Sequence, residues 1–277
     1  MSQSRVVCEH QALADYFRDR VCRRTCATRA LFGAAGAALV RAMSIEVEAQ
    51  AAVTDIDILQ FAMNLEWLEA EFYTVATTGR TLEQSGFTVS GEGRQGSTTG
   101  GAKVVLTGNV QTAADALTRD EQAHVRLLQA ALDGHAIAKP SINLNALGVG
   151  FNSQNEFLTL SRAFEDVGVS AYGGAAPLIR NKDVLATAAR IALTEAQHAG
   201  AIRELVSQTT GLTITPVDPI DVPTAGSANG QLFAVDGNGL SPVRTPSQVL
   251  KIVLGGADRA GGFFPDGFNG SGALNHA

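Results

Sequence analysis

Six acidic and imidazole residues are spaced as ligands of a metal centre would be: Glu66, Glu121, His124, Glu165, Glu195 and His198. Four of them form two Glu-x-x-His pairs. On an α-helix, positions i and i+3 lie on one face about one turn apart, so both side chains of such a pair can reach one ion. Four carboxylates neutralise two divalent cations, and carboxylate oxygen with imidazole nitrogen suits iron or manganese. The set predicts a site for two iron ions, with manganese as the alternative.

A single Glu-x-x-His pair is weak evidence, because such pairs are common on solvated helix faces. This chain, however, has only five His, and two of them stand three residues after one of its 13 Glu. The recurrence favours the metal site over chance.

Four Ala/Leu-rich segments must carry these residues. Their apolar periodicity predicts helices over about 54–78, 111–134, 153–180 and 182–208, with a short fifth helix over 247–254. In each long segment apolar residues recur every three or four positions and form one stripe, and the candidate ligands replace apolar residues near its middle. Because a buried carboxylate without a partner is costly, four of them at one level require a common partner. We expect an all-α four-helix bundle.

An internal repeat supports this arrangement. Tyr73 and Tyr172 each follow a candidate ligand by seven residues, Glu66 and Glu165 respectively. The chain therefore reads as two copies of a helical hairpin, each supplying a Glu and then a Glu-x-x-His pair. We expect both tyrosines to pack in the core, where they could also form hydrogen bonds or carry a radical.

Two positions leave alternatives open. Glu66 aligns with Glu165 by the tyrosine spacing, but Glu69 lies one turn further on and could replace it as the ligand of the first helix. Glu71 is expected to face solvent. Arg162, one turn before Glu165, is expected either to pair with a ligand carboxylate or to lie on the surface.

Glycine marks the segments outside the bundle. Of the 29 Gly, eight lie in 79–108, between the first two helices, and twelve follow Gln208. We divide the chain into a leading segment (1–51), the bundle (52–210) with its Gly-rich insertion, and an extended irregular tail (211–277) whose short helix packs on the bundle.

The leading segment resembles a twin-arginine export signal. Arg23 and Arg24 precede a mildly apolar run over 30–40, and Ala49-Gln50-Ala51 is a candidate cleavage site. This predicts an exported protein of the periplasm or cell envelope. The alternative is an amphipathic helix that stays attached to a cytoplasmic protein.

The composition excludes several classes of metal site and of protein. All three Cys lie within the first 26 residues, so the rest of the chain cannot hold a Cys-based metal site. A formal net charge of −6 offers no basic surface for nucleic acid. The chain contains no apolar run long enough for a stable membrane span.

With these motifs, residues 54–208 resemble the ferritin-like domain proteins of the exported bacterial type, which are similar to plant desiccation-related proteins. The resemblance implies a long crossover between the second and third helices. It also implies a dimetal site at the six residues, with Glu121 and Glu195 bridging. The insertion and tail argue against a hollow multi-subunit cage, and leave a homodimer as an option.

Two functions follow from the resemblance. The first is a dimetal-carboxylate oxidoreductase that acts on oxygen, peroxide or ferrous iron. The alternative is a non-catalytic, stress- or desiccation-protective envelope protein with a structural or vestigial metal site. The sequence does not decide between them, because one fold can host both.

Overall fold

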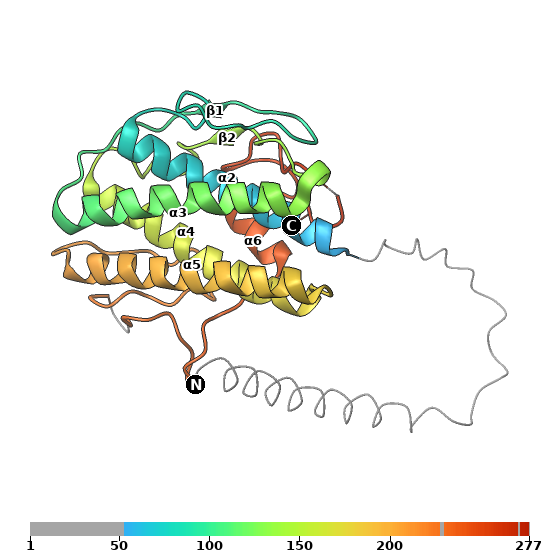
Figure 1. Cartoon of the computed structure of the whole chain (residues 1–277). Helices are drawn as coiled ribbons and strands as arrows, with labels where there is room; N and C mark the ends of the chain where they lie inside the picture. Colours follow the sequence, from blue (N-terminus) through green and yellow to red (C-terminus); the bar gives the residue numbers. More distant parts are fainter. Residues whose placement is uncertain (1–52, 228–229, 271, 277) are drawn as a thin grey trace, which may run out of the picture. The chain divides into compact units, whose positions relative to one another are not determined.

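Four long helices form a bundle in the computed structural model, which describes residues 53–227, 230–270 and 272–276 (Figure 1). They are α2 (Asp55–Thr78), α3 (Gly108–Leu132), α4 (Gln154–Ala175) and α5 (Lys182–Gln208). The shorter α6 (Pro246–Val253) packs against α4. The expected all-α four-helix bundle is confirmed. The predicted leading segment, with all three Cys, lies outside the described residues.

The helix ends follow local chemistry. Thr54 caps α2 in a capping box with Asp57, and Gly79, with a φ of 76°, ends it in the left-handed conformation. Helix α4 ends at Ala175, earlier than the end at residue 180 that the sequence predicted. The chain there tightens into the 3₁₀ helix η2 (Ala176–Leu178), which contains Pro177, and proline cannot continue the α-helical hydrogen-bond ladder.

The helices pair as two hairpins, as the internal repeat predicted. Helix α2 packs chiefly against α3, and α4 against α5, with further contacts between α2 and α4 and between α3 and α5. The crossover from α3 to α4 begins with the 3₁₀ helix η1 (Asp133–His135). It includes strand β2 (Ile142–Asn143), which pairs in parallel with strand β1 (Thr98–Thr99) of the insertion.

Helix α2 is covered on nearly all sides. Every residue from Ile58 to Ala76 except Ala62 is buried. The bundle covers one side of the helix, and the insertion, the crossover and the end of the tail cover the other (Figure 1). Asn64 and Asn269 join α2 to the tail. The Asn64 side-chain amide donates to the Asn269 carbonyl oxygen, and the Asn269 backbone N–H donates to Asn64 Oδ1. The irregular segments are therefore part of the fold's core packing.

This cover explains why the expectation for Glu71 was wrong. Its side chain is fully buried, and its Oε2 accepts a hydrogen bond from the backbone N–H of Leu82 (3.2 Å). The buried ammonium of Lys139 lies 3.9 Å from the same oxygen and 3.1 Å from Glu83 Oε1. Glu71 thus anchors the insertion and the crossover to the outer face of α2.

Buried arginines hold the tail against α4 and α5. Arg162 bonds with both side-chain oxygens of Asp221 and also lies 3.0 Å from Asp166. Both expectations for Arg162 were wrong, because it is buried and pairs with the tail rather than with a candidate ligand. Arg203 bonds with Asp166 and with four backbone carbonyls of the tail.

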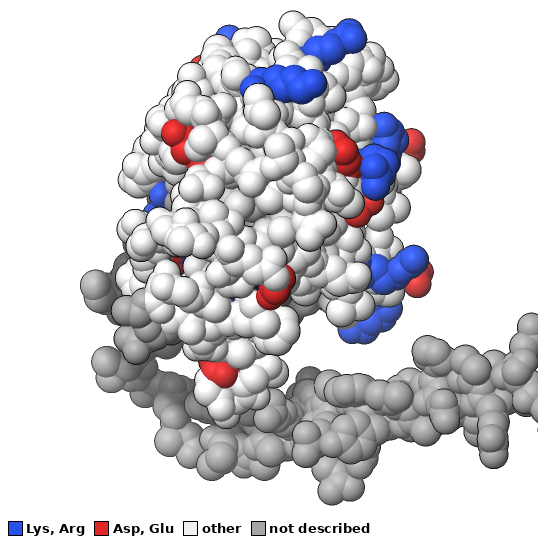
Figure 2. Space-filling view, turned by 90° about the vertical axis from the view of Figure 1, so that its left-hand side faces the viewer, with Lys and Arg blue, Asp and Glu red and all other residues white. Residues whose placement is uncertain are grey.

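The surface carries few charges at one end of the bundle. The end at which α3 begins and α5 finishes shows mostly uncharged side chains, with Lys and Arg towards its margins (Figures 1 and 2). Among the described residues, no helix is both long and apolar enough to cross a membrane.

Candidate metal centre

The six candidate ligands meet in the middle of the bundle. Glu66 comes from α2, the Glu121–His124 pair from α3, Glu165 from α4 and the Glu195–His198 pair from α5. The four carboxylates are at most 1% exposed and the two imidazoles 7%. All four helices therefore present polar groups to a space that the apolar stripes close off from water.

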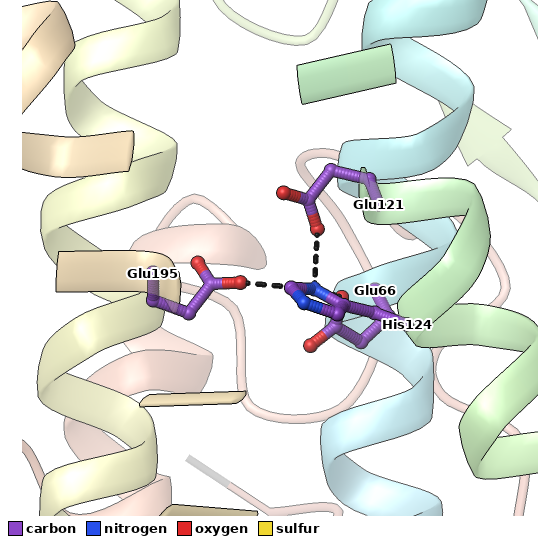
Figure 3. Close-up of side chains that lie close together, drawn as sticks. All are labelled: Glu66, Glu121, His124 and Glu195. Carbon is purple, nitrogen blue, oxygen red and sulfur yellow. Dashed lines mark hydrogen bonds and ion pairs between the residues drawn. The ribbon is translucent and has the colours of Figure 1, made fainter. Parts of the chain in front are cut away.

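The ligand atoms form two overlapping groups of four. Glu66, Glu121, His124 and Glu195 make up the first, and their side chains point toward one another (Figure 3). The second consists of Glu121, Glu165, Glu195 and His198. Within each group the ligand atoms all lie within 4.8 Å of one another. Glu121 and Glu195 belong to both groups, and Glu121 directs Oε2 at His124 and Oε1 at His198.

The first group is centred on His124. Its Nδ1 lies 3.0 Å from Glu121 Oε2, 3.2 Å from Glu66 Oε2 and 3.2 Å from Glu195 Oε1. One ring nitrogen cannot donate to three carboxylates, since it carries at most one hydrogen. Four atoms that converge in this way could hold a cation.

The second group shows the same feature more clearly. His198 Nδ1 lies 2.9 Å from Glu121 Oε1 and 3.4 Å from Glu165 Oε2, yet it forms a hydrogen bond with neither. Buried side-chain atoms of the centre without a hydrogen-bond partner are Glu121 Oε1, Glu165 Oε2, both Glu195 oxygens and His198 Nδ1. Native proteins pair nearly all such atoms. Divalent cations would satisfy all five, so the residues present fit a dimetal centre.

The two tyrosines cross-link the hairpins at this level. The Tyr73 hydroxyl of α2 donates to Glu165 Oε1 of α4, and the Tyr172 hydroxyl of α4 donates to Glu66 Oε1 of α2. Each bond holds one oxygen of a carboxylate and leaves the other, Oε2, directed at an imidazole of the centre. The expected core packing of both tyrosines is accompanied by a specific positioning contact.

Comparison with known proteins agrees with this geometry. The profile of the family described as ferritin-like domain matches residues 54–208. The chain belongs to this ferritin-like family. A relative is the ferritin-like catalase Nec2 of Nesocodon mauritianus, 23% identical over 266 residues, an alignment that covers 78% of this chain and 84% of Nec2.

One residue of this ferritin-like centre gave no signal in the sequence. Asp120, directly before Glu121, lies with its Oδ2 3.2 Å from Nε2 of His198. A carboxylate on the outer nitrogen fixes the ring orientation and the tautomer of a ligating histidine. It therefore directs Nδ1 of His198 into the centre. Only the packing of α3 against α5 reveals the contact, because the two residues are far apart in the sequence.

Glu69 lies beside the centre but in neither group of four. It is buried, and a Cβ added at Gly168 would lie 3.3 Å from Glu69 Oε1 and 2.7 Å from Glu195 Oε2. Glycine at position 168 therefore leaves the room that the two carboxyl groups fill. The geometry groups Glu66, and not Glu69, with the other candidate ligands.

Burial and mutual repulsion control protonation here. Burial, followed by the charge of Glu195, raises the pKa of Glu69 well above its usual value, and burial raises that of Glu195 likewise. Burial raises the pKa of Glu121 to about 7. Burial alone would also raise the pKa of Glu66, but the nearby His124 outweighs it and lowers that pKa.

The pKa values of the two imidazoles are raised, although burial acts to lower them. Burial acts to lower the pKa of His198, but its contacts with Glu121 and Glu165 outweigh burial and raise it to about 11. The carboxylates around His124 raise its pKa in the same way. Without cations the centre thus retains protons at neutral pH, which offset the charge of the clustered carboxylates.

Proposed function

We propose that this ferritin-like protein binds two iron or manganese ions and dismutates hydrogen peroxide to water and dioxygen. The observation that carries the proposal is the pair of overlapping ligand groups that share Glu121 and Glu195. In this proposal Glu121 and Glu195 would contribute to holding both ions. Glu66 and His124 would complete the ligands of one ion, and Glu165 and His198 those of the other.

The donor set supports iron or manganese. Four carboxylates and two imidazoles, without thiolate, match the oxygen and nitrogen preference of these metals. Four carboxylates also balance the charge of two divalent cations. The two ions would supply a redox pair that accepts and returns the electrons exchanged between two peroxide molecules.

Dismutation is favoured over reactions that need a separate reductant. In dismutation one peroxide is oxidised to dioxygen and a second is reduced to two waters, so electrons and protons balance without a donor. The chain has no Cys after residue 26 and so lacks a thiolate-bound electron-transfer site in the ferritin-like region. The relative Nec2, aligned along most of both chains, is named as a catalase.

The chain's own residues would prepare this reaction. The Tyr73 and Tyr172 hydroxyls hold Glu165 and Glu66 in place. Burial and the neighbouring carboxylates raise the pKa of Glu69, which favours the protonated form of this carboxyl group beside Glu195. In this proposal that carboxyl group would give a proton to the oxygen released when the peroxide bond breaks.

The test is reconstitution of the purified chain with ferrous iron or manganese, followed by metal analysis and oxygen-electrode measurements with peroxide. We expect two ions per chain and one dioxygen evolved for two peroxides consumed, without added reductant. Bound metal below one ion per chain, or no dioxygen evolution, would contradict the proposal. Bound metal with raised thermal stability but no turnover would instead support the protective function with a structural site. Consumption of dioxygen during iron loading would support iron oxidation.

A further inference from the structure

A groove runs along the outside of α4 and α5 and reaches one of the two tyrosines. It has a volume of about 400 Å³. Its walls include Gly173 of α4, Ala188 and Ala192 of α5, and Pro242 and Val243 of the tail, and Tyr172 also lines it. A second cavity of about 250 Å³, which shares Val169 and Pro242 with the first, extends it along the same two helices.

Tyr172 connects this groove to the metal centre. The residue lines the groove and is half-buried, whereas its hydroxyl donates to Glu66, one of the candidate ligands. One side chain thus extends from a surface cavity to the centre. The equivalent tyrosine of the other hairpin differs, since Tyr73 is 0% exposed and its ring contacts Phe72 and Phe157. The tyrosine of the first hairpin is therefore enclosed in the core, whereas the tyrosine of the second hairpin borders a surface groove.

The side chains that line the groove determine which kinds of molecule can pass along it. The residues that line the groove beside Tyr172 are all uncharged, and most are alanine, valine or glycine. An ion would lose its hydration there without gaining charged partners, and that transfer is costly. A small uncharged molecule has no such penalty.

We propose that this groove is the path by which small uncharged molecules reach and leave the metal centre, with the ring of Tyr172 as its gate. Peroxide would enter and dioxygen would leave along it, which rests on the proposed function. The gate is closed while the Tyr172 hydroxyl bonds to Glu66, and it opens when that bond breaks and the ring turns away from Glu66. Val243 of the tail covers the outer side, where a Cβ added at Gly173 would come within 2.8 Å of Val243 Cγ1.

The first experiment measures access without catalysis. The iron(II) protein is mixed with nitric oxide, a small uncharged ligand, and its association is followed by stopped-flow absorbance. Ala192→Phe places a ring in the groove and should slow association roughly tenfold or more, because access becomes limited by the path. Ala201→Phe, at an exposed position of α5 outside the groove, is the matched control and should associate at the wild-type rate. Both variants should retain the wild-type metal content.

A second variant tests the same path independently, in case Ala192→Phe does not fold. Val243→Trp changes a tail side chain that is 56% exposed, so the bundle core is untouched, and it should also slow association. Equal association rates in wild type, Ala192→Phe and Val243→Trp would overturn the proposal. Access would then run by another face, such as the one between α3 and α5 beside Asp120.

A third measurement separates this proposal from the proposed function. Crystals of the metal-free protein under xenon pressure should hold xenon in the groove next to Tyr172, and Ala192→Phe should displace it. Absence of xenon there in the wild type would overturn the path whether or not metal binds. A protein that binds nitric oxide through the groove but does not turn over peroxide would overturn the proposed function and leave the path standing.

Discussion

The Tyr73 hydroxyl on α2 donates a hydrogen bond to Glu165 on α4. The reciprocal bond runs from Tyr172 on α4 to Glu66 on α2, so each hairpin positions a candidate ligand of the other. Both tyrosines also have pKa values well above the usual one, because their hydroxyls are buried and lie beside carboxylates. They therefore stay protonated and remain donors at all physiological pH values.

Removal of one hydroxyl should weaken one ion position. In Tyr73→Phe the ring stays but Glu165 loses its donor, so we expect metal affinity at the Glu165–His198 position to fall about 10–100-fold, as is usual for contacts that orient ligands. Chelator competition measures the affinity. Tyr172→Phe is the reciprocal variant and should weaken the Glu66–His124 position instead. Wild-type affinity in both variants would show that the bonds serve packing alone.

Asp120 should act through His198. Asp120→Ala removes the carboxylate that lies 3.2 Å from Nε2 of His198, so the imidazole loses its fixed orientation. We expect a loss of about 10–100-fold in the affinity of one ion. Asp115→Ala, which changes an exposed acid on the same helix, is the control for the loss of a negative charge from α3. An equal loss in both variants would mean that Asp120 acts only through its charge.

Metal binding should release protons. Without cations, the candidate ligands Glu121 and His198 have pKa values of about 7 and about 11. These groups therefore hold protons at pH 7 that ligation by cations displaces, and affinity should rise with pH. An indicator dye in weak buffer, read during manganese addition at pH 7, should report release of at least one proton per chain. Binding without release would contradict the assigned ligands.

The tail should loosen in acid through Asp218. Two hydrogen bonds from Arg244 hold the pKa of this carboxyl below its ordinary value of 3.8. A folded-state pKa below the unfolded value stabilises the protein above pH 3.8, and this contribution is lost as the pH falls through the folded-state value. Asp218→Asn should therefore lower the Tm at pH 7, and the difference from wild type should shrink below pH 3.8.

The control for this prediction is Asp258→Asn. Asp258 lies in the tail with its side chain 69% exposed, and its replacement should leave the Tm unchanged at pH 7. A difference between Asp218→Asn and wild type that is the same at pH 7 and pH 3 would show that Asp218 acts by packing rather than by charge.

Sequence periodicity located the bundle well because each long helix buries a stripe of its own. The segment predicted over 182–208 coincides with α5, and the one over 54–78 differs from α2 by a single residue. The six candidate ligands could be identified from the sequence for the same reason, since they interrupt those apolar stripes at one level. Local pattern was sufficient wherever the relevant contact lies within one helix face.

The rest depends on contacts between distant segments. Glu71 has the position of a solvent-facing residue within α2, and only the folded insertion and Lys139 explain its burial. Arg162 is similar, because its partner Asp221 lies in a tail without helical period. The role of Asp120 follows only from the side-by-side placement of α3 and α5.

The central claim is that Glu121 and Glu195 serve two ions at once, and metal content per chain tests it most directly. We would reconstitute wild type, Glu66→Ala and Glu121→Ala under identical conditions and measure iron or manganese by mass spectrometry. The account predicts two ions in wild type, one retained in Glu66→Ala, and loss of both in Glu121→Ala. Fewer than one ion in wild type, or two ions retained in Glu121→Ala, would contradict it.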